Sequence, residues 1–130
     1  MKKNKASAET PYVRMFIESG ILHFYYKKID NLDLGVAQLC VKDRMEYTDF
    51  QDYPCLIDAI SIKHFTKEAR DYFANEGNEG IIASAILTSS TTIKMMANFY
   101  IMVNKPQNPT RMFTDKTSAL EWLEQFNKQK

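Results

Sequence analysis

Hydrophobic and polar positions divide the chain into short strands and amphipathic helices. Residues 55–62 and 80–87 are apolar almost throughout and lack helical spacing, so the pattern predicts two strands that are covered on both faces. Asp58 is the only charge in the first run and lies near its carboxyl end. We expect a helix to follow from Thr66 to residue 75, with the Thr66 hydroxyl as its N-cap. This strand, loop and helix are the centre of the predicted fold.

The N-terminal part has the pattern of a β-hairpin followed by a helix. Residues 12–17 and 21–26 are rich in β-branched and aromatic residues, and the short segment between them contains a glycine, which favours a tight turn. A helix is expected over 32–45, with Asp30 or Asn31 as its N-cap. Its buried stripe is predicted to consist of Leu32, Val36, Leu39 and Cys40.

The C-terminal part predicts a helix over 92–103, a short strand over 111–113 and a final helix that Thr114 or Asp115 caps. The residues of the final helix that should point inward are Ala119, Leu120, Leu123 and Phe126. The complete order is β-β-α-β-α-β-α-β-α. Alternating strands and helices of this kind are typical of an α/β domain, here a mixed β-sheet with flanking helices. We expect this single domain over residues 11–130, after a flexible N-terminal tail over 1–10.

The helix expected over 92–103 is apolar nearly all round. One side of its helical wheel is formed by Ile93, Met96, Ala97, Tyr100 and Val103, and the opposite side by Met95, Phe99 and Met102. Such a helix is either buried on both sides or presents an exposed apolar patch. The hairpin or the loop at 106–109 could cover its second side. Otherwise, the surface for an apolar ligand or a partner consists of Met95, Met96, Phe99, Tyr100 and Met102.

The composition is that of one globular domain without a strong charge field. The chain has 130 residues, of which 45% are hydrophobic and 25% charged, and its net charge is +1. Basic and acidic residues alternate, which argues against nucleic-acid binding. No apolar run approaches the ~20 residues of a membrane span and no secretory signal is evident, so we expect a cytoplasmic protein. Cys40 and Cys55 are expected to be free buried thiols, with a disulfide as the alternative.

Few residue patterns point to chemistry. The sequence lacks a Gly-rich phosphate loop, a nucleophile elbow and metal-ligand spacing, so we expect no enzymatic activity, no catalytic residue, no metal and no cofactor. Sites in open α/β sheets lie at the carboxyl ends of strands, and here those residues are Asp58, Ser61, His64 and Thr66. A hydrolytic arrangement of Asp58, His64 and Thr66 is the less favoured alternative, because Asp58 also suits hydrogen bonds to loop N–H groups. His23, alone in a strand, is expected to be structural.

Several segments match a known pattern. They are ILHFYY (21–26), LID (56–58), TKEARDYF (66–73), MANFY (96–100), NKP (104–106), PTRMFTD (109–115) and ALEWL (119–123). With the element order, they resemble the SpoIIAA-like fold that STAS domains share with lipid-carrier domains of the SEC14 type. The resemblance covers residues 12–126 and is closest to small bacterial STAS/SEC14 domain-containing proteins of the Bacteroidetes type.

The resemblance implies two kinds of function. STAS domains such as anti-sigma factor antagonists bind a partner kinase, and phosphorylation of a Ser or Thr at the start of the helix after the central strand switches them. Thr66 is the hydroxyl at that position here, but the usual Asp-Ser-Ser/Thr-Gly signature is absent and Lys67 replaces a second hydroxyl. Domains of the SEC14 type imply an apolar ligand or contact with a membrane surface, which suits the helix over 92–103.

We therefore expect a non-enzymatic STAS-like regulatory or protein-interaction module that is switched at the start of the helix after the central strand. The alternative is a small carrier of an apolar or lipid-like ligand, or a protein that associates with a membrane surface through the Met-rich helix. A carrier should have a cavity lined by Met95, Phe99 and Met102. An interaction module should hide this face against a partner protein or, in a homodimer, against a second copy.

Overall fold

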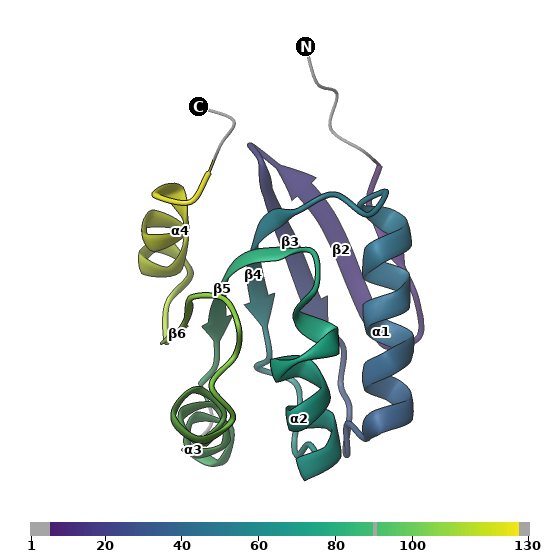
Figure 1. Cartoon of the computed structure of the whole chain (residues 1–130), viewed down its shortest axis with the longest axis vertical. Coiled ribbons are helices and arrows are strands. Elements are labelled where there is room, and N and C mark those ends of the chain that lie inside the picture. The colour runs from purple at the N-terminus through teal and green to yellow at the C-terminus, as the bar shows by residue number, and fades with distance from the viewer. Residues whose placement is uncertain (1–5, 90, 128–130) are drawn as a thin grey trace.

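A six-stranded mixed sheet forms the centre of the computed structural model, which describes residues 6–89 and 91–127 (Figure 1). The strands lie side by side in sequence order: β1 (Ala8–Glu9), β2 (Val13–Glu18), β3 (Ile21–Tyr26), β4 (Tyr53–Asp58), β5 (Ile81–Leu87) and β6 (Thr110–Phe113). Strands β1 to β3 pair antiparallel, and strands β3 to β6 pair parallel. The prediction of an α/β domain with a mixed sheet is confirmed.

Helices cover both faces of this sheet. They are α1 (Leu34–Tyr47), α2 (Lys67–Ala74), α3 (Thr91–Phe99) and α4 (Lys116–Glu124), with a 3-10 turn η1 (Glu76–Asn78) and a π-helical turn η2 (Tyr100–Asn104). Helices α1, α2 and α3 pack on one face, and α4 packs on the other (Figure 1). In β4, Cys55 belongs to the core beneath α1, whereas the adjacent Leu56 contacts α4. A strand covered on both sides has no polar face, which explains its apolar run.

The predicted hairpin is confirmed, and one strand precedes it. Ser19 and Gly20 form its turn with φ angles of 52° and 81°, a combination that suits a two-residue turn between antiparallel strands. The prediction of a flexible tail over residues 1–10 is wrong for Ala8 and Glu9, which form β1 and pair with β2. Residues 1–5 lie outside the described part of the chain.

Helix α1 begins two residues later than predicted. Its N-cap is Asp33, whose side chain accepts a hydrogen bond from Val36 N at 2.9 Å, in place of Asp30 or Asn31. Leu32 is buried as predicted, but it lies before the helix and forms a β-bridge with Phe65. The prediction that Leu39 is buried is wrong, because its exposed fraction is 42%. The buried residues of α1 are Ala37, Cys40, Val41 and Arg44.

Strand β4 ends at Asp58, whereas the apolar run continues to residue 62. Asp58 Oδ1 accepts a hydrogen bond from Ile60 N at 3.0 Å, and Ile62 N donates to Ala59 O at 3.2 Å, which turns the chain out of the sheet. Ala59 and Ile62 still pack into the core beneath α2 and α3. The run is therefore apolar because the loop after the strand is also buried.

The helix predicted over 92–103 consists of α3 and η2. Ile93, Ala97 and Tyr100 are buried as predicted, but Val103 has an exposed fraction of 58%. The cause is the π-helical turn, in which Lys105 N donates to Tyr100 O at 3.2 Å, five residues earlier. Each residue of a π-helix advances the wheel less than in an α-helix. Val103 therefore lies outside the buried stripe.

The predictions for the final helix and the cysteines hold. Asp115 caps α4 by accepting a hydrogen bond from Ser118 N at 2.8 Å, which decides against Thr114. Both cysteines are free and buried, and burial raises the pKa of each thiol to about 12. Thiols with such pKa values stay protonated at neutral pH and are poor nucleophiles.

His23 generates a prediction for pH-dependent stability. Its ring has an exposed fraction of 2% and stacks on Phe16 at 4.5 Å, and its Nδ1 has no hydrogen-bond partner within the described residues. Burial, and then the charge of Lys116, lower the pKa of His23 below its ordinary 6.5. The stability that neutral His23 contributes is complete above the unfolded-state pKa and is lost as the pH falls toward the lowered pKa.

We expect the free energy of unfolding of the wild type to fall between about pH 7.5 and about pH 5.5 by more than that of His23→Phe, which keeps the stacked ring without titrating. Urea denaturation at both pH values measures the difference. His64→Gln is the control, since His64 lies exposed on a loop. Equal losses in the wild type and His23→Phe would contradict the prediction.

Candidate functional site

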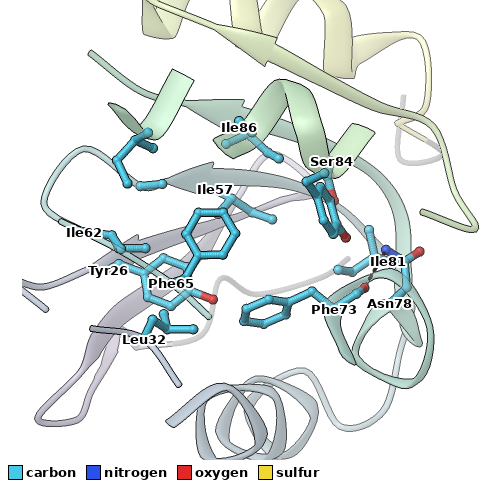
Figure 2. A pocket seen from close by; sticks show the side chains of 14 residues that line it. Tyr26, Leu32, Ile57, Ile62, Phe65, Phe73, Asn78, Ile81, Ser84 and Ile86 are labelled. Atoms are coloured by element: carbon cyan, nitrogen blue, oxygen red, sulfur yellow. Dashed lines mark hydrogen bonds between the residues drawn. The ribbon is translucent and has the colours of Figure 1, made fainter. Parts of the chain in front are cut away.

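An apolar pocket lies between the sheet, α2 and the helix formed by α3 and η2 (Figure 2). Its volume is about 90 Å³. Its walls are formed by Tyr26, Leu32, Ile57, Ala59, Ile62, Phe65, Phe73, Asn78, Ile81, Ser84, Ile86, Ile93, Ala97 and Tyr100. Its apolar walls are typical of a small-molecule site, but its volume is below that of most ligand pockets.

Small side chains at the interface of helix and sheet leave this space. Ile57 and Ile86 are register partners in β4 and β5 and form the floor (Figure 2). Ser84 on β5 and Ala97 on α3 are short, so they do not fill the gap between the sheet and the helix. Tightly packed interiors seldom leave such a void.

One part of the wall is polar. Asn78, with an exposed fraction of 2%, donates a hydrogen bond to Phe73 O at 3.3 Å and accepts one from Asn108 Nδ2 at 2.6 Å. Burial raises the pKa of Tyr100, while a hydrogen bond with Asn78 opposes the rise. The pocket is therefore mainly apolar, with a hydrogen-bonding group held in place at one side.

The outer face of α3 and η2 is apolar and points to solvent. Met95, Met102 and Val103 have exposed fractions of 68%, 73% and 58%. These three residues are called the outer methionine face below. The side chains of Met96 and Phe99 lie outside the described part of the structure.

The predicted apolar surface is thus divided between two places. Met95 and Met102 lie on the outer methionine face, whereas Tyr100 is 8% exposed and lines the pocket. Met95 and Met102, which a carrier was expected to have in its cavity wall, do not line this pocket, because it lies on the opposite side of the helix. Within α3, Ile93 is buried and Met95 is exposed. This agrees with the helical wheel, on which two residues that are two positions apart differ in angle by about 200°.

The residues predicted at the carboxyl end of β4 do not form a connected cluster. Asp58 accepts from the Ile60 N–H, His64 Nδ1 lies 2.8 Å from Asn31 Oδ1, and Thr66 Oγ1 accepts from Ala69 N at 3.1 Å. Ser61 is exposed. In the described part of the chain, no hydrogen bond or ion pair joins any two of these four residues. The expected loop hydrogen bond of Asp58 and the expected cap of Thr66 are both present.

Neither a cluster of metal ligands nor a membrane-spanning helix is found within residues 6–89 and 91–127. No three His, Cys, Asp or Glu residues are close enough there to hold a metal ion. None of the helices described combines the length and the hydrophobicity that are needed to cross a bilayer.

Sequence reasoning missed one buried charge. Arg44 on α1 has an exposed fraction of 4% and donates a hydrogen bond to Gly77 O at 2.9 Å. It lines a second cavity of about 30 Å³ next to the apolar pocket. The sequence signal for its burial is its position four residues after Cys40, which places both residues on the same side of α1. An arginine at that spacing is usually assigned to the surface.

Comparisons with known proteins agree with the fold. A family model described as "Domain of unknown function (DUF7793)" matches residues 15–127. Among solved structures, the chain is similar to an uncharacterized protein of the DUF3478 family with a SpoIIAA-like fold from Shewanella loihica PV-4. The two are 11% identical, the match covers 95% of this chain and 97% of that one, and the TM-score is 0.58. This likeness shows a SpoIIAA-like fold. No curated protein matches the chain.

The two sides of α3 should respond differently to truncation. Ile93→Ala should lower the free energy of unfolding by about 2–4 kcal/mol, because it removes a side chain with an exposed fraction of 1% beside an existing cavity. The matched control Met95→Ala on the exposed side should change it by less than about 0.5 kcal/mol. Urea denaturation followed by circular dichroism measures both. Similar losses in the two variants would place α3 in a different orientation.

Proposed function

The chain belongs to the family described as a domain of unknown function (DUF7793), and we propose that it is a non-enzymatic regulatory or protein-interaction module of the STAS type. Its relation to small STAS/SEC14 domain-containing proteins is part of this proposal. A cytoplasmic location is also part of the proposal, and the free thiols of Cys40 and Cys55 support it. The proposed contact surface is the outer methionine face.

The observation that carries the proposal is the exposure of Met95, Met102 and Val103 on one helix. Large apolar side chains that gather on a surface indicate a site of protein interaction. Methionine suits such a surface, because its unbranched, polarizable side chain adapts to the shape of a partner. The helix is not strongly basic, since Lys94 is the one basic residue of segment 91–104 and Lys105 follows it, and a membrane surface would favour a more cationic helix. A protein partner with an apolar patch therefore fits best.

The proposed switch is phosphorylation of Thr66 at the start of α2. Its hydroxyl caps the helix, and a phosphate there would meet the positive end of the helix dipole. Helix α2 is joined to η2 by a hydrogen bond from Asn104 Nδ2 to Asp71 Oδ1. Asp71 also accepts a hydrogen bond at 2.9 Å from Lys67, the residue that directly follows the N-cap Thr66. These contacts form a physical connection between the proposed switch and the helix that carries the contact surface.

The second candidate function is the binding of a small apolar ligand. The pocket beneath α3 is the observation that favours it. An apolar cavity of 150 Å³ engineered in another protein holds benzene, so a space of about 90 Å³ fits a group smaller than benzene. A complete lipid chain would require α3 to move away from the sheet. The pocket therefore supports a carrier of compact ligands better than a carrier of lipids.

Native mass spectrometry of gently purified protein tests the contact surface. We expect the wild type to retain a protein partner or a second copy, and the double variant Met95→Lys/Met102→Lys to lose it, because two charges would be buried in the interface. Leu39→Lys, which replaces an exposed apolar residue on α1, is the matched control and should retain the partner. A wild type that is monomeric and free of bound protein argues against the module. A bound mass of small-molecule size would favour the second candidate.

The switch has a separate test. Thr66→Glu should change the affinity for the partner while lowering the free energy of unfolding by about 1 kcal/mol, as expected for a weakened cap. Thr66→Ala loses the cap without adding charge, and Thr66→Ser keeps it. Isothermal titration calorimetry and urea denaturation on the three variants separate charge from capping. If Thr66→Glu and Thr66→Ala bind the partner equally well, Thr66 is only a cap.

A further inference from the structure

Arg44 is a buried cation without an anionic partner in the described part of the chain. Its guanidinium group carries several N–H donors, yet its only hydrogen bond to the described residues is the one to Gly77 O. No described carboxylate forms an ion pair with it. Arginine keeps its charge in proteins even when buried, and a buried charge without a counter-ion is costly. A ligand anion would offset that cost.

The backbone around Arg44 leaves room for its head group. Gly80 has a φ of 82°, and a Cβ at this position would lie 3.3 Å from Arg44 Nη1. Gly77 supplies the carbonyl that orients the guanidinium group. The positive charge of Arg44 also lowers the pKa of Tyr26 and of Cys55, although burial raises both overall. The charge of Arg44 therefore acts on side chains of strands β3 and β4.

The cavity beside Arg44 adjoins the apolar pocket. The two cavities have volumes of about 30 Å³ and about 90 Å³. They share the walls formed by Tyr26, Ile57, Phe73 and Ile81 (Figure 2). A ligand that entered both would have its apolar part between α3 and the sheet and its polar head toward Arg44.

We propose that this double cavity binds a small monocarboxylate whose apolar part is smaller than a benzene ring, with the carboxylate paired to Arg44. Carboxylates match the planar guanidinium fork and accept two parallel hydrogen bonds from it. The apolar part contacts Ile57, Phe73 and Ile81. The inference rests on the second candidate function, that the pocket binds an apolar ligand, and adds its chemical class.

Butyrate and the neutral 1-butanol are matched probes for this site, because their short alkyl chains are smaller than a benzene ring. With wild-type protein at neutral pH, isothermal titration calorimetry should show butyrate binding about ten-fold or more tightly than 1-butanol, as a charged hydrogen bond provides. Arg44→Met should remove this preference and leave 1-butanol binding unchanged. Lys42→Met removes an exposed charge from the same helix and should keep the preference. Circular dichroism confirms that each variant is folded.

A second measurement does not depend on the Arg44 variant. Nuclear magnetic resonance of the wild type should show contacts from the butyrate alkyl chain to the Ile57 and Ile81 methyl groups and a shift of the Arg44 Nε–Hε signal. Equal affinities for the two probes, or contacts elsewhere on the surface, would overturn the assignment of Arg44. If neither probe binds, the apolar-ligand function fails as well. If 1-butanol binds equally well in the pocket, only the carboxylate preference fails.

Discussion

The burial of β4 and β5 on both faces is the constraint on which the structure depends. Alternate residues of these parallel strands face opposite helix layers, so neither strand can present a polar side. Leu56, Ala83 and Ala85 pack against Ala119 and Leu123 of α4, and the small alanines allow the helix to lie close to the sheet. On the other face, Ile57 and Ile86 lie beneath α3. The single helix on one side therefore packs densely, whereas the three-helix side contains the pocket.

Helix α3 links the two candidate functions, because it is both a wall of the pocket and the carrier of the outer methionine face. Ile93 and Ala97 hold it against the sheet, while Met95 and Met102 project to solvent. A partner bound to the outer side would restrain α3, and a ligand larger than the pocket would have to displace the same helix. If both proposals hold, the two binding events are coupled through this one element.

Local patterns predicted most of the fold, because short apolar runs and cap residues determine strands and helix ends within a few residues. Long-range contacts produced the errors. The bridge between Leu32 and Phe65 moved the start of α1, and the π-helical turn displaced Val103. A helical wheel predicted a second apolar side with Met95 and Met102 but left open whether this side is exposed. The pocket could not, since it depends on the volumes of side chains from several elements, and neither could Arg44, whose hydrogen-bond partner is 33 residues away.

Both edges of the sheet are short. Strand β1 has two residues and β6 has four, so each edge offers few free backbone groups to an incoming strand. Long exposed edges are where sheet proteins join irreversibly into aggregates. A chain with short edges can display an apolar helix in water while self-association through strand addition remains weak.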